Sequence, residues 1–266
     1  MKPESPIGVF DSGVGGLTVV RALMQRLPNE NIVYFGDTAR VPYGIKSDAT
    51  IREFAAQIVR FLLERNPKLL IVACNTMAAV AAREIAGLSS VPVLDVIDAG
   101  ARAAVARSAS KKIGVIGTLT TVNSGAYEYA IRQFAADADV RSRACPLFVP
   151  LVEEGWLDHP VTRLTAQEYL QPLLGDGIDT LVLGCTHYPL LQSLLQEVVG
   201  AHIELVDSAL TVAEQAAALL DETQLANPAR GPAQYDYYVT DVPQRFQEIG
   251  ARFLGRPLTN TQVVKW

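Results

Sequence analysis

Two cysteines stand in matching contexts along this chain of 266 residues. Cys74 follows the apolar run 69–73 and precedes an alanine-rich segment, whereas Cys185 follows the apolar run 180–184. A thiol between a buried strand and a helix start lies at the sheet edge where α/β proteins bind ligands, and the helix dipole favours its thiolate. The pattern predicts two working thiols, the alternative being that both are packed core cysteines.

Two thiols on opposite sides of a cleft suit a reaction that inverts a carbon centre. One thiolate removes a proton from one face, and the opposite thiol returns a proton to the other face. A stable disulfide is disfavoured in a reducing compartment, and a metal site lacks an evident third and fourth ligand. Cys145, which Pro146 follows, has no comparable context and is predicted to be structural.

Polar residues also follow the first apolar run of the chain, residues 7–10. Asp11 would orient an amino group or assist a proton transfer, unless it only caps a turn, and Ser12 would donate to a carboxylate. The glycine-rich turn 13–16 that follows would let the backbone approach a ligand closely. This turn, with Asp37 after the second strand, is also compatible with part of a dinucleotide fingerprint, although Thr18 replaces its last glycine.

Three further positions are candidates for the same site. His187 follows Cys185 by two positions and would assist proton transfer or hold substrate, the alternative being a capping histidine. Tyr43 lies in a tight loop set by Pro42 and Gly44, where its ring would wall a pocket. Glu153 either faces the cleft or belongs to a solvated helix start.

The elements expected to position these residues alternate between short strands and amphipathic helices. Strands are predicted at 7–10, 31–35, 69–73 and 91–96, and helices at 47–64 and 77–86. The pattern then restarts, since the Ile-Gly-Val of 113–115 repeats that of 7–9 and the second cysteine context repeats the first. This duplication predicts an α/β fold of two pseudo-symmetric, doubly wound, mainly parallel-sheet lobes with the active site between them.

The expected lobes differ in make-up. The first comprises residues 1–98 together with 208–266, and the second comprises residues 99–207. The C-terminal tail, residues 208–266, is expected to hold one helix at 210–220 and a strand at 235–239. It is expected to pack back on the first lobe.

Composition narrows the class of protein. Hydrophobic residues make up 49% and charged residues 19%, which is typical of a globular fold. A net charge of −5 disfavours direct binding to nucleic acid or anionic lipid. Three cysteines without a C-x-x-C pair disfavour a disulfide framework or structural zinc. Residues 1–6 lack a signal-peptide core and the apolar stretch 69–82 is too short to span a bilayer, so a cytoplasmic location is expected.

Four motifs together resemble bacterial glutamate racemases, within the aspartate/glutamate racemase superfamily. They are D-S-G-x-G-G at 11–16, P-Y-G at 42–44, A-C-N-T at 73–76 and G-C-T-H-Y-P-L at 184–190. The resemblance spans most of the chain. His187 favours the glutamate branch, since the aspartate enzymes typically carry Glu at that position.

The resemblance implies a cofactor-independent racemase that uses no pyridoxal phosphate, metal or nucleotide. Cys74 would take the α-proton of D-glutamate and Cys185 that of L-glutamate, with Asp11 and His187 assisting the thiols. The implied substrate-binding residues are Ser12, Tyr43, Gly44, Asn75, Thr76 and Thr186, with Glu153 as a further acidic position and Thr118 and Thr121 as carboxylate contacts from the second half. The product, D-glutamate, would supply cell-wall peptidoglycan.

Other functions stay open from the sequence. The chain is also compatible with a racemase of aspartate or another amino acid, or with a non-catalytic amino-acid sensor. Some glutamate racemases bind DNA gyrase and many form homodimers, so the resemblance makes both candidate partners. No membrane partner is expected.

Overall fold

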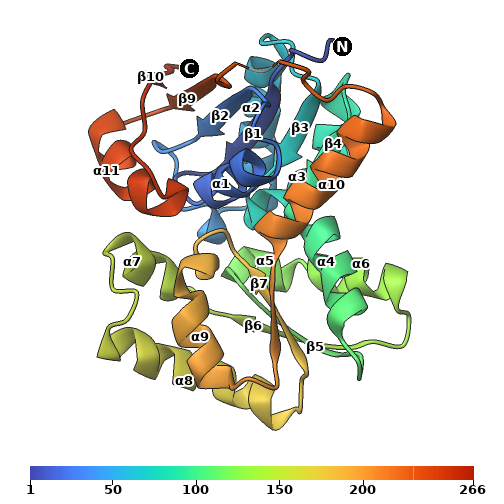
Figure 1. Ribbon diagram of the computed structural model, residues 1–266. Coiled ribbons are helices and arrows are strands. Elements are labelled where there is room, and N and C mark those ends of the chain that lie inside the picture. The colour runs from blue at the N-terminus through green and yellow to red at the C-terminus, as the bar shows by residue number, and fades with distance from the viewer. Residues whose placement is uncertain (230) are drawn as a thin grey trace.

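Two parallel β-sheets organise the molecule, one in each lobe of the computed structural model, which describes residues 1–229 and 231–266 (Figure 1). The upper sheet has the strand order β10-β9-β2-β1-β3-β4 and the lower sheet the order β6-β5-β7-β8. Each described strand pairing is parallel. The predicted α/β fold with two parallel-sheet lobes is confirmed.

The strands run as follows: β1 (Ile7–Asp11), β2 (Ile32–Gly36), β3 (Leu69–Val72), β4 (Val93–Asp95), β9 (Tyr235–Val239) and β10 (Thr261–Val263) in the upper sheet, and β5 (Lys112–Gly117), β6 (Asp139–Ala144), β7 (Thr180–Gly184) and β8 (Glu204–Asp207) in the lower sheet. The central strands β1, β3 and β7 are buried along their whole length. They are almost entirely apolar because helices cover both faces of each sheet.

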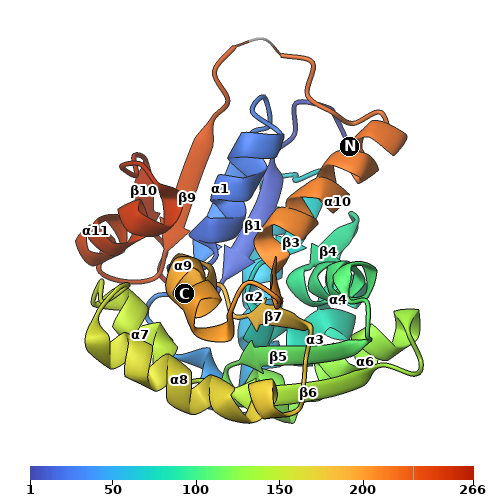
Figure 2. The ribbon, with the colours of Figure 1, turned by 60° about the horizontal axis from the view of Figure 1, so that its bottom comes forward.

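Helices α1 (Leu17–Arg26), α10 (Ser208–Glu222) and α11 (Pro243–Leu254) pack on one face of the upper sheet, and α2 (Asp48–Leu63) and α3 (Asn75–Leu88) on the other (Figures 1 and 2). In the lower lobe, α4 (Val96–Arg107) packs on α6 (Ala126–Phe134), and α8 (Pro160–Gly175) packs on α9 (Gln192–Val199). Short helices complete it: α5 (Leu119–Asn123), α7 (Phe148–Glu153), η1 (Tyr43–Ile45) and η2 (Tyr188–Leu191). None of the helices in the described ranges is both long and apolar enough to cross a membrane.

Two predictions about the elements were wrong. The tail contains two helices rather than one, because Phe246, Gly250 and Phe253 give α11 a buried stripe with helical spacing that packs on α1. Helix α3 begins at Asn75 instead of residue 77, since Cys74 itself caps it and its Sγ accepts a hydrogen bond from the Met77 N–H at 3.4 Å. The site residues Asn75 and Thr76 therefore belong to the first helical turn.

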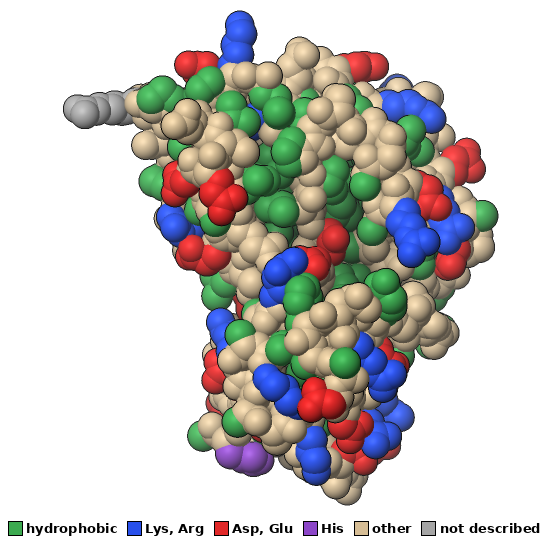
Figure 3. Space-filling view, turned by 90° about the vertical axis from the view of Figure 1, so that its right-hand side faces the viewer, with side chains coloured by type: hydrophobic (Ala, Val, Ile, Leu, Met, Phe, Trp, Pro, Cys, Tyr) green, Lys and Arg blue, Asp and Glu red, His purple; other side chains and the backbone are tan. Residues whose placement is uncertain are grey.

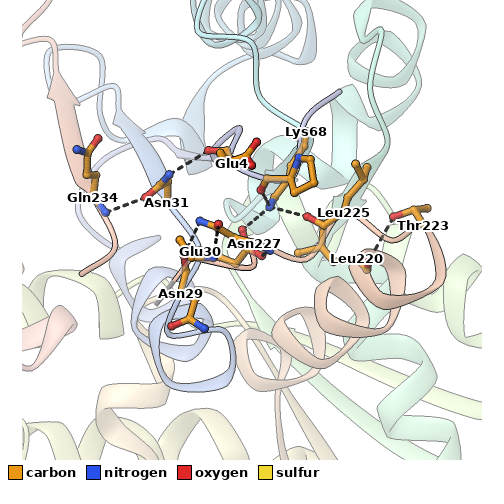
Figure 4. Close-up of polar contacts among 12 residues, drawn as sticks. Glu4, Asn29, Glu30, Asn31, Lys68, Leu220, Thr223, Leu225, Asn227 and Gln234 are labelled. Atoms are coloured by element: carbon orange, nitrogen blue, oxygen red, sulfur yellow. Dashed lines mark hydrogen bonds and ion pairs between the residues drawn. The ribbon is translucent and has the colours of Figure 1, made fainter. Parts of the chain in front are cut away.

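A buried ion pair ties together the amino ends of the upper strands (Figure 4). The Lys68 ammonium is fully buried and pairs with the Glu30 carboxylate, which is 3% exposed. Lys68 also donates to the carbonyl oxygens of Pro3 and Leu225, and Glu30 accepts from the Asn227 N–H at 2.7 Å. Breaking such a pair leaves an uncompensated buried charge, so these contacts anchor the N-terminal segment and the chain leaving α10.

The side of the molecule at the right of Figure 1 carries both signs of charge. Over the lower lobe, Lys and Arg side chains lie beside Asp and Glu side chains (Figure 3). On α4, Arg102 pairs with Asp98 at 2.8 Å, and on α6, Arg132 pairs with Glu128 at 3.0 Å. Such exposed pairs contribute about 0.3–0.5 kcal/mol each, so the buried core holds the lobe together.

Candidate active site

A cavity of about 70 Å³ lies between the lobes, where β1, β3, β5 and β7 end. Cys74 lines it from the upper lobe and Cys185 from the lower lobe. Nine other predicted site residues line it: Ser12, Tyr43, Gly44, Asn75, Thr76, Thr118, Glu153, Thr186 and His187. Asp11 and Thr121 lie behind this lining and contact it through hydrogen bonds.

The Cys74 thiol is held by its own helix and by the loop after β1. Its Sγ accepts from the Met77 N–H and lies 3.6 Å from the Ser12 Oγ, to which it donates. Burial and the nearby Asp11 carboxylate raise the pKa of Cys74 to about 12. Because only a thiolate can accept a proton, Cys74 is poised as a proton donor in this state.

Asp11 is a buried carboxylate with spare hydrogen-bonding capacity. Its Oδ2 accepts from the Gly13 N–H at 2.9 Å, while its Oδ1 has no hydrogen-bond partner among the described residues. Burial raises the pKa of Asp11. A buried acceptor without a partner favours a ligand that brings a donor, and an ammonium group is such a donor.

The second thiol lies beside a histidine–glutamate pair. The Cys185 Sγ is 3.9 Å from the His187 Nδ1, and the His187 Nε2 is 3.0 Å from the Glu153 Oε1. Burial alone would lower the pKa of His187, but its hydrogen bonds to Cys185 and Glu153 raise it to about 10. The bond from His187 in turn lowers the pKa of Glu153. A protonated His187 stabilises negative charge on Cys185, so the two thiols have opposite electrostatic surroundings.

Three threonine hydroxyls bridge the lobes at one end of the cavity. The Thr76 Oγ1, at the start of α3, lies 3.0 Å from the Thr118 Oγ1 and 3.5 Å from the Thr121 Oγ1. Thr118 and Thr121, at the start of α5, are 2.9 Å apart through their hydroxyls. Since a hydroxyl can donate or accept, this cluster can turn its protons toward a carboxylate.

Tyr43 contributes a wall and leaves its hydroxyl outside the site. The Tyr43 hydroxyl donates to the buried Asp37 carboxylate, which also accepts from the Thr240 Oγ1 at 2.9 Å. These bonds hold the loop that carries Gly44, where a Cβ would lie 3.0 Å from that of Thr118. Asp37 is thus engaged within the fold, which gives the dinucleotide interpretation no free ribose ligand.

The glycine-rich turn packs closely against both lobes, and its Gly13 lines the cavity. A Cβ on Gly15 would lie 2.1 Å from the Thr186 Oγ1 and 2.7 Å from the His187 Nδ1. A Cβ on Gly16 would lie 2.6 Å from that of Asp11. Glycine at position 15 therefore lets the upper lobe approach the Thr186–His187 segment of the lower lobe, whereas glycine at position 16 lets the turn pack on Asp11 within the upper lobe.

Several residues of this region escaped the sequence prediction. The Tyr127 hydroxyl donates to the Asn75 Oδ1 at 2.7 Å, the Phe253 ring packs edge-on against His187, and the Arg252 guanidinium donates to the Glu153 carbonyl at 2.9 Å. They come from α6 and α11 and belong to no local motif, so only a tertiary contact reveals them.

Cys145 lies outside the cavity lining, and the metal alternative concerns a separate question. Cys145 is buried, its carbonyl accepts from the Tyr188 hydroxyl at 2.9 Å, and burial raises the pKa of its thiol to about 12. Within the described ranges, no three His, Cys, Asp or Glu side chains converge as metal ligands would.

Known proteins resemble this chain both in sequence and in structure. The Asp/Glu/Hydantoin racemase family profile matches residues 7–216. A glutamate racemase of Syntrophus aciditrophicus is 66% identical over 98% of this chain and 96% of its own length. The glutamate racemase of Francisella tularensis, solved with D-glutamate, has a TM-score of 0.93 at 41% identity and covers 99% of this chain and 98% of its own. An isoform from Bacillus anthracis has a TM-score of 0.95 at 37% identity, with the same coverage. The predicted resemblance is confirmed, and the chain belongs to the Asp/Glu/Hydantoin racemase family, among its glutamate racemases.

Proposed function

We propose that this chain interconverts L- and D-glutamate by two-thiol proton transfer at Cα. One observation carries the proposal: Cys74 and Cys185 line a single cavity from opposite lobes, each within two residues of the end of a corresponding central strand. The substrate follows from relatives named glutamate racemase and from a related enzyme solved with D-glutamate. The chain is accordingly an isomerase.

The proton count closes over one turnover. With L-glutamate, the Cys185 thiolate takes the α-proton and the Cys74 thiol delivers its own proton to the opposite face, which leaves Cys185 as thiol and Cys74 as thiolate. D-glutamate reverses these roles. His187 stabilises the charge on Cys185, and Asp11 disfavours charge on Cys74 until a substrate ammonium offsets its carboxylate.

Substrate binding must also acidify an α-proton that a thiolate does not readily remove. The Asp11 Oδ1 is the candidate acceptor for the α-ammonium, and the Asn75 Nδ2 is a candidate donor to a carboxylate. The remaining proposed contacts are Ser12, Thr76, Thr118, Thr121 and Thr186 through their hydroxyls, Tyr43 and Gly44 through the loop, and Glu153 through His187. Positioning and fixed dipoles would supply the rate enhancement, with no cofactor in the scheme.

Solvent exchange tests this reaction. In D₂O the protein alone should incorporate deuterium at Cα of either enantiomer, followed by NMR, while circular dichroism follows racemisation. Cys74→Ala and Cys185→Ala should each lose full racemisation, and the matched control Cys145→Ala should keep it. Normal turnover in either active-site variant would refute the two-base scheme. A panel with aspartate and other amino acids tests the substrate, and tight glutamate binding without exchange would indicate a sensor.

The cellular role and assembly are further proposals. D-glutamate would supply peptidoglycan from the cytoplasm, and the resemblance makes a second copy of this chain and DNA gyrase the candidate partners. Sedimentation velocity tests the homodimer, and a pull-down with purified gyrase tests the gyrase interaction.

The lobes would comprise residues 1–98 with 208–266, and 99–207. The pairing of β9 and β10 with the upper sheet supports the first, while α4 begins just before the boundary at residue 98.

A further inference from the structure

The Asn75 amide is buried at the cavity, and only its oxygen has a hydrogen-bond partner among the described residues. Its Oδ1 accepts from the Tyr127 hydroxyl at 2.7 Å, and its Nδ2 lacks a hydrogen-bond partner in the described part of the chain. An amide group can exchange the places of its oxygen and nitrogen by a half-turn, so its neighbours decide which end faces a ligand. Here the neighbour comes from the other lobe, since Asn75 begins α3 and Tyr127 lies on α6.

The hydroxyl of Tyr127 can favour one amide orientation. The distance of 2.7 Å is typical of O–H···O bonds, whereas N–H···O bonds are typically about 2.9–3.0 Å long. Its other reachable acceptor, the Val96 carbonyl, is farther away at 3.5 Å. The hydroxyl proton is therefore directed to the Asn75 oxygen.

The ring of Tyr127 sits in a space that two glycines leave open. A Cβ on Gly184 would lie 2.9 Å from the ring, and a Cβ on Gly100 would lie 3.2 Å from both the Tyr127 hydroxyl and the Ser208 Cβ. Val96 begins α4 and Ser208 begins α10, the two helices that follow the chain's crossings between the sheets. Tyr127 thus contacts the segments where the chain passes from one lobe to the other, and it also bonds the Asn75 amide at the cavity.

We propose that Tyr127 is a positioning residue whose hydroxyl holds the Asn75 amide with its Nδ2 toward the cavity. This keeps a donor, rather than a carbonyl oxygen, facing a substrate carboxylate. The inference rests on the proposed binding of glutamate and adds a residue that does not itself contact the substrate. Its effect must therefore pass through Asn75.

A double-mutant cycle tests that dependence. Tyr127→Phe keeps the ring and removes the hydroxyl, so kcat/KM for glutamate should fall about tenfold, mainly through KM. In the Asn75→Ala background the same change should alter kcat/KM less than about twofold, because no amide remains to orient. Calorimetric affinity for D-glutamate on all four forms gives the same cycle without requiring turnover.

Tyr188→Phe is the matched control, since its equally buried hydroxyl in the same lobe bonds the Cys145 carbonyl instead. It should lose comparable stability in urea without the loss in D-glutamate affinity. Equal losses from Tyr127→Phe in both Asn75 backgrounds, or no loss in either, would overturn the proposal. If the unmodified protein neither binds nor racemises glutamate in these assays, the proposed function itself fails.

Discussion

Replacing Glu153 by glutamine removes a charge that, together with the hydrogen bond to Cys185, raises the pKa of His187. The His187 Nε2 lies 3.0 Å from the Glu153 Oε1, and the His187 Nδ1 lies 3.9 Å from the Cys185 Sγ. Glutamine has the size of glutamate and keeps a hydrogen-bonding oxygen, so the His187 ring should stay in contact with Cys185. The variant therefore isolates the electrostatic contribution of the carboxylate.

The expected size of the effect follows from this geometry. An opposite charge in hydrogen-bond contact commonly shifts a pKa by about 1–3 units, and the Glu153 side chain is 33% exposed, so solvent places the effect near the lower end. The pKa of His187 should fall from about 10 to about 8–9 in Glu153→Gln. Because the cation stabilises the Cys185 thiolate, kcat/KM is expected to decline as pH rises through the pKa of His187.

A pH profile of kcat/KM reads out this shift. Near pH 7 the variant should lie within about twofold of the unmodified enzyme, and near pH 10 it should be about five- to fiftyfold slower. The equilibrium constant between enantiomers is one in an achiral solvent, so the L and D profiles must move together. NMR titration of His187 is practical because the chain has only 3 histidines. Glu154→Gln, an exposed neighbour, is the control.

Two results would contradict this reasoning. An unchanged NMR pKa for His187 in Glu153→Gln would show that the carboxylate does not raise the pKa of the imidazole. A lowered NMR pKa with an unmoved alkaline limb of kcat/KM would show that the charge on His187 does not control proton transfer at Cys185.

Three further substitutions have definite expected outcomes. Lys68→Met leaves the buried Glu30 charge unpaired and should cost about 3–5 kcal/mol in urea unfolding while sparing turnover at 25 °C. Hydrogen bonds outweigh burial and lower the pKa of Asp179 to about 2, so Asp179 stabilises the fold above about pH 4 and loses that effect as pH falls through 2. Asp179→Asn should accordingly cost about 1–2 kcal/mol at pH 7, and urea titrations should show the difference shrinking at pH 3. Gly15→Ala forces a methyl against Thr186 and should lower racemisation more than about hundredfold with an unchanged far-UV spectrum.

Local pattern was enough to predict the framework and the thiols. Buried strands such as β3 and β7 read as short apolar runs, and a cysteine directly after each run must emerge at the carboxyl edge of its sheet. Parallel strands share that edge, so the sequence placed Cys74 and Cys185 at comparable positions before any contact was known. The same reasoning placed Ser12 at this edge, whereas Thr118 was expected there from the family resemblance, and both line the cavity.

Helix α11 shows where the sequence reading stopped short. Its stripe of Phe246, Gly250 and Phe253 has helical spacing, but it lies in a segment that was expected to hold only a strand after residue 220. Its function is also non-local, since Phe253 packs on His187. Neither partner indicates the other along the chain.

Only the tertiary structure decided how the site is tuned. The bonds from Tyr127 to Asn75 and from His187 to Glu153 join residues that lie in different helices and loops. The first contact depends on how the two lobes pack across the cavity, and the second on how α7 packs on the segment after β7 within the lower lobe. Periodicity along one element carries no information about either packing. Local chemistry therefore identified the thiols, whereas contacts between segments far apart in the sequence placed Asp11 near Cys74 and Glu153 beside His187.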